Sequence, residues 1–222
     1  MKLSDTTISV LKNYSTINQN LKIGAGNNLS TMSAMKNIVS KCTVAETFDK
    51  DIAIYDLNEF LASMSIFVNP ELDFNDNFVM MCGEKSNDTL QYWYSDPSVV
   101  TTVTKEITMP STEITFTLSN EELSNITKAA AVIGAPDMVL ENGSLKVTDK
   151  KNNTANHFSM EVELLGEEVR QPDYKFWFKV ENLKLMPGTY DVNISSKRIS
   201  HFKNTNVDIE YYIALEPESY YK

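Results

Sequence analysis

Glycine and proline are scarce in this 222-residue chain, which has 7 of each. This scarcity excludes collagen-like repeats and low-complexity linkers. Apolar runs are short, and none approaches the roughly 20 residues that a membrane-spanning helix requires. The opening residues, MKLSDTTISVLKNY, lack the apolar core and the small-residue cleavage site of a secretory signal. The sequence therefore predicts a globular chain that makes no contact with a membrane.

Cysteine and histidine are almost absent, and the motifs of common catalytic sites are missing. Cys42 and Cys82 are too few to frame a secreted fold of this size, so we expect two reduced, buried thiols. His157 and His201 have no Cys or His neighbours at metal-ligand spacing. The chain has no phosphate-binding glycine loop, no G-x-S-x-G and no C-x-x-C. We therefore predict no metal, no cofactor and no catalytic residues.

Positive charge is also in short supply. The chain has 20 Lys and Arg against 30 Asp and Glu, a formal net charge of −10. Both halves are acidic, and neither carries a basic tail. A protein that grips DNA by neutralising many phosphates should be basic. This protein therefore either avoids nucleic acid or holds it by something other than bulk charge.

Two sequence patterns suggest a binding site but have a simpler structural interpretation. Asp73, Asn75 and Asn77 match a calcium loop with Glu84 at its twelfth position, but Phe78 stands where that loop needs glycine. A polar β-turn followed by a strand explains this pattern better. The aromatic residues at 92–94, and Trp177 in KFWFKV, could stack on bases, but no basic residue flanks the first group within three positions. Packing in half-buried strands is favoured for both.

The order of secondary-structure elements predicts an α+β fold. Helices are expected at 5–17, at 57–66 and from Ser119 onwards, with a short helix within 180–188, because apolar residues there recur with a helical period. Short β-prone runs separated by turn residues fill most of the rest. Asn142-Gly143 is the best hairpin signal in the chain.

The second half of the chain repeats the first. LSDTTISVLKNY and LSNEELSNITKA align at an offset of 115, so that Leu3 matches Leu118 and Ser4 matches Ser119. The similarity is weak residue by residue and stronger in the order and capping of the elements, and such repetition is weighed before local motifs. We predict two similar domains, 1–96 and 113–222, joined by a connector at 97–112 that partly pairs as a strand. Two unrelated α+β domains are the alternative.

Segments at both ends of the chain and near its first quarter resemble a known family. MKLSDTTISVLKNYSTIN, DIAIYDLNEFL, LMPGTYDVNI and YYIALEPES are similar to the sliding clamps of T-even-type bacteriophages, the processivity factors of DNA polymerases. The resemblance implies a DNA-clamp fold, in which each of two similar domains packs two helices on antiparallel sheets. It further implies a head-to-tail homotrimeric ring without an active site, with helices lining the hole and sheets outside.

The resemblance also implies the partners and the location. They are duplex DNA threaded through the ring without sequence specificity, the C-terminal peptide of the DNA polymerase, an ATP-driven clamp loader and late-transcription factors. The cytoplasm of the infected bacterial host is the expected compartment. An acidic balance fits such a ring, because topology rather than affinity keeps it on DNA, and strong phosphate contacts would slow sliding.

Helix geometry selects a few lysines that could face the duplex. These candidates lie on or beside polar helix faces, or just before the first helix: Lys2, Lys12, Lys128 and Lys184. Simple solvation is the alternative for each of them. Glu59 opposes Leu57 and Phe60 on its helix and argues against a uniformly positive lining.

The resemblance places the groove for a partner peptide between the domains, beneath the connector and beside the C-terminal segment. An apolar anchor in a groove is a common way to hold such a peptide. The candidate residues are Val99, Val100, Val103, Ala214, Leu215 and Pro217. The valines could instead simply cover the domain junction. For the whole chain, a non-catalytic β-rich structural or assembly protein of a phage is the alternative, and an enzyme with ungrouped carboxylates is a third possibility.

Overall fold

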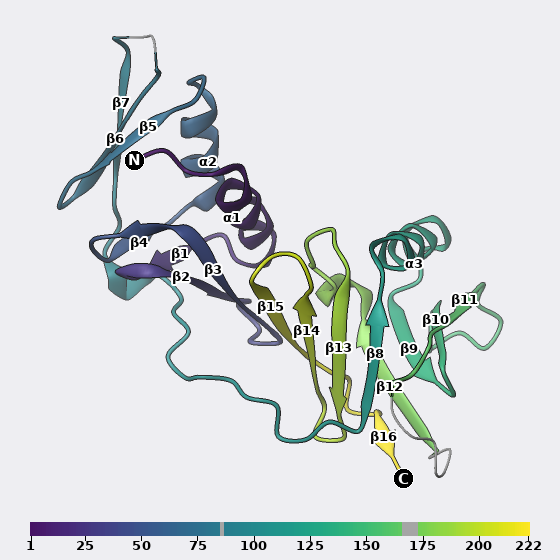
Figure 1. Cartoon of the computed structure of the whole chain (residues 1–222). Helices are drawn as coiled ribbons and strands as arrows, with labels where there is room; N and C mark the ends of the chain where they lie inside the picture. The colour runs from purple at the N-terminus through teal and green to yellow at the C-terminus, as the bar shows by residue number, and fades with distance from the viewer. Residues whose placement is uncertain (85–86, 166–172) are drawn as a thin grey trace. The chain divides into compact units, whose positions relative to one another are not determined.

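The computed structural model describes residues 1–84, 87–165 and 173–222. The chain divides into two compact units, Met1–Lys105 and Glu106–Lys222. Each unit has its own buried apolar core. Figure 1 shows both units with the labels used below.

The first unit begins with helix α1 (Asp5–Ile17), as the sequence predicts. The Ser4 hydroxyl accepts a hydrogen bond from the Thr7 backbone N–H and caps the helix. Val10, Leu11, Tyr14 and Ile17 are buried, which is the spacing of one helical face. That face holds α1 on the core and leaves the opposite face in solvent.

Helix α2 (Leu57–Ser65) confirms the second predicted helix to within a residue. The Asp56 carboxylate accepts the backbone N–H groups of Asn58 and Glu59 at its start. Leu57, Phe60 and Met64 are its buried residues. In the same unit α1 packs against α2 and against the long strand β3 (Ile38–Phe48).

All sheets of the first unit are antiparallel. Strands β1 and β4 form one pair, β2 and β3 form a second, and β5, β6 and β7 form a three-stranded sheet in that order. The strands are β1 (Leu21–Ile23), β2 (Gly26–Met32), β3 (Ile38–Phe48), β4 (Ile52–Ile54), β5 (Glu71–Phe74), β6 (Phe78–Cys82) and β7 (Thr89–Trp93).

The second unit starts with β8 (Ile114–Leu118) and helix α3 (Asn120–Ile133). Ser119 and Glu122 form a complete capping box, in which each side chain accepts the backbone N–H of the other residue. Gly134 ends the helix with a positive φ of 64°. The N-caps Ser4 and Ser119 are thus 115 positions apart, so the repeat seen in the sequence reproduces the start of a helix in both units.

Two antiparallel sheets complete the second unit. Strands β15, β14, β13 and β8 neighbour one another in that order, and the five-stranded sheet has the order β11-β10-β9-β12-β16. The β9–β10 hairpin turns at Asn142 and Gly143, both with positive φ, as the Asn-Gly signal predicts. The strands are β9 (Asp137–Glu141), β10 (Ser144–Thr148), β11 (Phe158–Glu161), β12 (Tyr174–Lys179), β13 (Tyr190–Ser195), β14 (Ile199–Asn204), β15 (Ile209–Ala214) and β16 (Tyr220–Tyr221).

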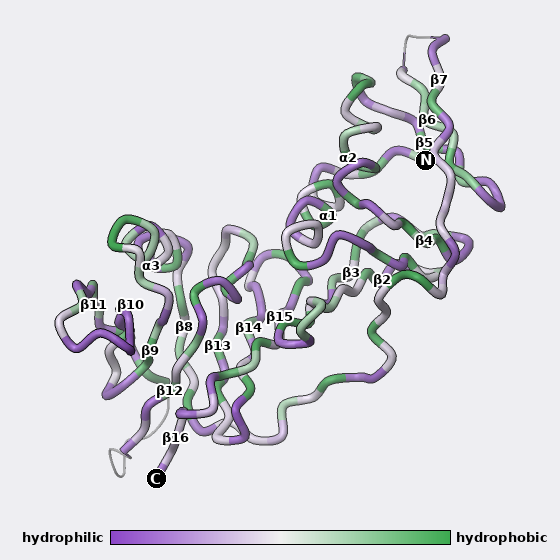
Figure 2. Tube along the Cα trace, turned by 180° about the vertical axis from the view of Figure 1, so that it is seen from behind, coloured by the Kyte–Doolittle hydropathy of each residue, from purple (hydrophilic) through white to green (hydrophobic). Residues whose placement is uncertain are grey.

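Two sequence predictions about local structure are wrong. After the single turn of 3-10 helix η1 (Pro97–Val99), the chain forms no strand before Ile114, whereas the sequence predicts partial strand pairing in the connector. Apolar and polar residues follow one another along this segment without a regular alternation (Figure 2).

The short helix expected within 180–188 is only one 3-10 turn, η2 (Val180–Asn182). No side chain caps its start. Valine and asparagine are poor helix formers, and a helix this short does not repay its nucleation cost.

Candidate functional site

The exposed face of α1 is nearly neutral. Lys12 is exposed on it, as the helical period predicts, and its exposed neighbours are mostly hydroxyl-bearing residues, including Thr6, Ser9 and Thr16. Asp5, in the first turn, is also exposed. This face therefore offers hydrogen-bonding groups with a single cation toward its centre.

The outward faces of α2 and α3 also carry mixed polar groups, but only α3 has a lysine. Lys128 is exposed on α3 together with Asn125 and Glu121, while Glu59 and Asn58 are exposed on α2. Glu59 thus opposes the buried face of α2, as the sequence indicates. Each unit presents one exposed helix lysine among amides, hydroxyls and carboxylates, so any positive potential there is weak.

The other two candidate lysines have different surroundings. The Lys2 ammonium lies 3.2 Å from a Glu84 carboxylate oxygen and 3.7 Å from one of Glu71. It therefore balances two carboxylates and adds little net positive charge for a ligand. Lys184 lies after η2, not on a helix, and is half-buried.

The six residues expected around a partner peptide belong to both units. Val99 is 54% exposed, Val100 is buried and Val103 is half-buried in the first unit. In the second unit Ala214 and Pro217 are exposed, whereas Leu215 is only 6% exposed and its backbone N–H donates to the Arg198 carbonyl at 3.0 Å. Leu215 is therefore a core residue, and of the C-terminal three Ala214 and Pro217 offer surface.

The aromatic run at 92–94 divides between core and surface. Tyr92 is half-buried, with its ring 5.3 Å from that of Phe60, and its hydroxyl donates to the Asp56 carbonyl at 3.1 Å. Core packing is thus confirmed for Tyr92. The prediction of core packing is wrong for Trp93. This residue lies at the end of β7, is 63% exposed and contacts Phe78 at the start of β6. The sequence analysis did not identify Trp93 as an exposed aromatic residue. The available signal was the alternation of exposed and half-buried side chains along β7.

In the described part of the chain, each unit has a sheet whose outer strand pairs along one edge alone. β7 is an outer strand of the three-stranded sheet, and β11 is an outer strand of the five-stranded sheet. Phe158 on β11 is 37% exposed. Beside β7, an open pocket of about 560 Å³ is lined in part by Ile66, Val68 and Leu90. Exposed apolar side chains at strand edges are typical of surfaces that pair with another chain.

The calcium-loop pattern is a hairpin turn, as expected. The Asn75 backbone N–H donates to the Phe78 carbonyl at 2.9 Å between β5 and β6. Trp177 is half-buried between the buried residues Phe176 and Phe178, which confirms the strand interpretation. Cys42 is a buried thiol, but Cys82 is partly exposed, contrary to expectation.

Among the described residues, no group of three or more His, Cys, Asp or Glu side chains could hold a metal ion. Over the same part of the chain, no helix is long and apolar enough to cross a membrane. The His201 Nε2 atom lies 2.8 Å from a Glu210 carboxylate oxygen, and its ring stacks on Tyr212.

Comparison with solved structures shows the fold. The proliferating cellular nuclear antigen of Entamoeba histolytica has a TM-score of 0.67 at 15% identity, covering 95% of this chain and 94% of that chain. The PCNA2–PCNA3 complex of Sulfolobus tokodaii has a TM-score of 0.67 at 13% identity, covering 98% and 100%. The Helicobacter pylori beta clamp bound to a DNA ligase peptide has a TM-score of 0.63 at 14% identity, covering 99% and 68%. The chain therefore has the clamp fold that the resemblance implied.

The chain is also similar in sequence to phage sliding clamps over its full length. The family model for DNA polymerase processivity factors matches residues 2–75, and the model for the C-terminal part of the gp45 sliding clamp matches 111–217. The sliding clamp of Vibrio phage KVP40 is 33% identical over 97% of this chain and 99% of its own length. The sliding clamp of Enterobacteria phage T4 is 26% identical over 99% and 98%. The chain therefore belongs to the family of phage sliding clamps, the processivity factors of phage DNA polymerases.

Proposed function

We propose that three copies of this chain close head-to-tail into a ring that encircles duplex DNA and holds the replicative polymerase on its template. The observation that carries this proposal is the full-length similarity to phage sliding clamps. The repeated helix start at Ser4 and Ser119 supports two similar domains, 1–96 and 113–222, with 97–112 as connector. Head-to-tail contacts between unlike ends of a subunit close into a ring when the rotation permits.

The exposed helix faces suit a surface that passes over DNA without gripping it. Each phosphate contact adds about 0.9 to the slope of log affinity against log salt, so many such contacts would oppose movement. Lys12 and Lys128 supply a weak attraction, while Glu59 and the uncharged side chains between them keep it weak. We propose that these faces line the hole, that no bond is made or broken there, and that the protein acts as a tether.

The open edges of β7 and β11 suit the contact between neighbouring copies. We propose that β7 of one copy pairs with β11 of the next, because each is an outer strand of its sheet. Trp93 and the pocket beside Ile66 would cover apolar side chains of the neighbour, such as Phe158.

The remaining partners follow from the family. We propose that the polymerase C-terminal peptide binds near Val99, Val103 and the exposed surface of Ala214 and Pro217. The Helicobacter pylori beta clamp, which shares this fold, holds a DNA ligase peptide, and this supports capture of a peptide here. An ATP-driven loader would place the ring on DNA in the cytoplasm of the infected bacterial host, where late-transcription factors would also use it.

Two measurements test the proposed function. The native mass should be three times the 25.1 kDa of the chain. On a long primed circular template, the protein should extend polymerase products only with a loader and ATP, and linearising the template should release it. A structural or assembly protein would give neither stimulation nor release. If the protein stays monomeric at high concentration, the proposal of a ring is wrong.

A further inference from the structure

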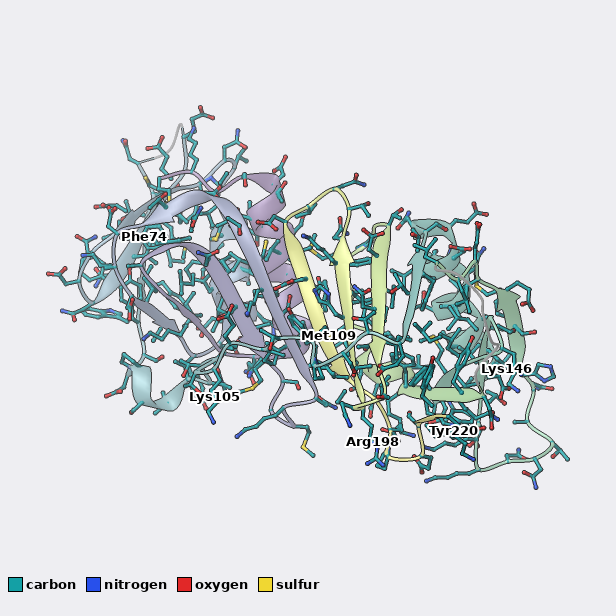
Figure 3. All side chains as sticks on the ribbon, turned by 60° about the horizontal axis from the view of Figure 1, so that its bottom comes forward. Phe74, Lys105, Met109, Lys146, Arg198 and Tyr220 are labelled. Atoms are coloured by element: carbon teal, nitrogen blue, oxygen red, sulfur yellow. The ribbon has the colours of Figure 1, made fainter. Side chains whose placement is uncertain are left out.

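One edge of strand β12 pairs with β9. The other edge is covered by the chain's own residues 216–222, here called the C-terminal strap. Within the strap, β16 pairs antiparallel with β12, placing Tyr221 opposite Tyr174 and Tyr220 opposite Lys175. Figure 3 labels Tyr220 on this segment. Strand pairing therefore covers only two residues of the β12 edge.

Beyond β16, the edge is satisfied by less regular bonds. The Glu216 backbone N–H donates to the Trp177 carbonyl at 2.8 Å, and the Trp177 N–H donates to the Ser219 hydroxyl at 2.9 Å. The Lys222 N–H donates to the Asp173 carbonyl at 2.8 Å. A side-chain hydroxyl thus stands where a neighbouring strand would offer a carbonyl, so β12 has the hydrogen-bonding capacity to pair with a longer strand.

Ion pairs with two lysines hold the acidic part of the strap. The Lys150 ammonium lies 3.0 Å from Glu216 and 3.3 Å from Glu218, and Lys179 lies 3.8 Å from Glu216. Burial alone would lower the pKa of Lys150, but its bonds to Glu216 and Glu218 raise that pKa above the ordinary value. Lys150 also lies 5.9 Å from the centre of the Trp177 ring, within cation–π range.

Aromatic contacts hold the other part of the strap. The Tyr221 ring stacks against Tyr174 and Phe176, with 6.4 Å between centres in both cases. The Tyr220 hydroxyl donates to an Asp173 carboxylate oxygen at 3.1 Å. The order along the strap is therefore two carboxylates, then a small hydroxyl, then two tyrosines.

The contacts divide between the surface and the interior. Glu218 and Tyr221 are exposed, and Pro217 interrupts the regular strand pattern, whereas Ser219 is buried and the Lys150 and Glu216 side chains are only 14% and 23% exposed. The exposed pair of Lys150 with Glu218 contributes little and is screened by salt. The strap is therefore held as a tethered peptide ligand is held, by modest contacts at high local concentration.

We propose that the edge of β12, with Lys150, Trp177 and Tyr174, is a binding site for an extended peptide of another protein in which acidic residues precede aromatic ones. The strap occupies this site in the free chain and shows the chemistry that fits it. The incoming peptide would replace the strap and add to β12 as a strand. This site requires neither the ring nor DNA, and it shares only Pro217 of the strap with the polymerase-peptide site proposed above, so its test does not depend on ring formation.

The test uses the full chain and a labelled peptide copied from the strap, EPESYYK. Glu216→Gln with Glu218→Gln weakens the strap without altering the site, so this variant should bind the peptide at least tenfold more tightly than the wild type by fluorescence anisotropy. Adding Lys150→Ala should remove that gain, and raising the salt should reduce it. The matched control is Glu181→Gln with Asp208→Asn, which removes two exposed carboxylates elsewhere in the unit. Equal peptide binding by the strap variant, the control and the wild type would overturn the proposal.

Hydrogen exchange in the unmodified chain provides a second measurement. The amides of Glu216, Lys222 and Trp177 should exchange at least tenfold faster than that of Val139 in the central strand β9, because the strap opens without unfolding the sheet. Excess strap peptide should slow exchange at Trp177. Exchange of all four amides at one rate would show that the strap is an integral strand, and the site would not exist.

Discussion

The Glu46 carboxylate on strand β3 accepts the backbone N–H of Ser4, as Glu122 accepts that of Ser119 in the second unit. Glu122 belongs to the helix that it caps, whereas α1 has Thr7 at the equivalent position. Glu46 also accepts the Thr7 hydroxyl. The capping carboxylate of the first unit is therefore supplied by the sheet, and it fastens the start of α1 to β3.

Removing this carboxylate should destabilise the first unit. Glu46→Ala should lower the free energy of unfolding by about 2 kcal/mol, because charge-assisted bonds to a helix start are lost. Burial alone would raise the pKa of Glu46, but the bonds from Thr7 and Ser4 outweigh it and lower that pKa below the ordinary 4.5. The contribution should thus be complete above that value and disappear as the pH falls through the lower pKa of the folded state.

Urea unfolding at pH 7 and in mild acid would measure this effect. The difference between wild type and Glu46→Ala should shrink in acid, and Glu163→Gln, which changes an exposed carboxylate, should unfold with the wild type at both pH values. A difference that is the same at both would assign the loss to packing rather than to the charge.

Reversing the charge at Lys12 and Lys128 should weaken contact with DNA and leave assembly of the ring intact. Lys12→Glu with Lys128→Glu should reduce processivity several-fold at moderate salt, because the ring loses contacts with phosphates. Each lost contact also lowers the slope of log affinity against log salt by about 0.9. Primer extension over a range of salt would measure it, with native mass as the check on assembly. Lys151→Glu with Lys197→Glu makes the same change in net charge at exposed turn positions and should leave processivity unchanged. Equal processivity in both double variants would show that the helix lysines do not meet the duplex.

Trp93 should stabilise the contact between subunits. Large aromatic residues contribute about 2 kcal/mol or more at the centre of such contacts, so Trp93→Ala should weaken each contact between two subunits about thirtyfold. Sedimentation across a dilution series would measure the shift. Tyr55, also exposed in the first unit at 61%, gives the control Tyr55→Ala, which should assemble as the wild type does. Unchanged assembly of Trp93→Ala would place the contact elsewhere.

Features set by nearby residues were predictable from the sequence. The helix starts at Ser4 and Ser119 and the Asn142-Gly143 turn depend on residues a few positions apart, and the structure has both helix starts and the turn where the sequence predicts them. The exposed positions of Lys12 and Lys128 follow from the same helical period.

Contacts between distant residues could not be predicted in this way. The Lys150–Glu216 pair joins residues 66 positions apart, and Glu46 reaches Ser4 across 42. The sequence places Leu215 in a pocket for a partner peptide, because Pro217, two positions later, suggests an irregular segment. The burial of the Leu215 side chain in the core depends on distant residues and could not be read from that pattern. A pattern that depends on local spacing carries no information about which distant strand lies alongside.

The burial of Leu215 changes how the partner-peptide site should be tested. A charge at Leu215, 6% exposed, would enter the core of the second unit and lower its stability by several kcal/mol, so lost peptide binding would say nothing about the site. Ala214 is exposed at the end of β15, and Ala214→Glu should leave the free energy of unfolding within about 0.5 kcal/mol of the wild-type value. It should weaken capture of the polymerase C-terminal peptide at least tenfold in a calorimetric titration, because that peptide would meet a charge where it needs an apolar surface. Thr205→Glu, an exposed substitution elsewhere in the unit, should bind the peptide normally. Normal binding by Ala214→Glu would move the peptide site away from the end of β15.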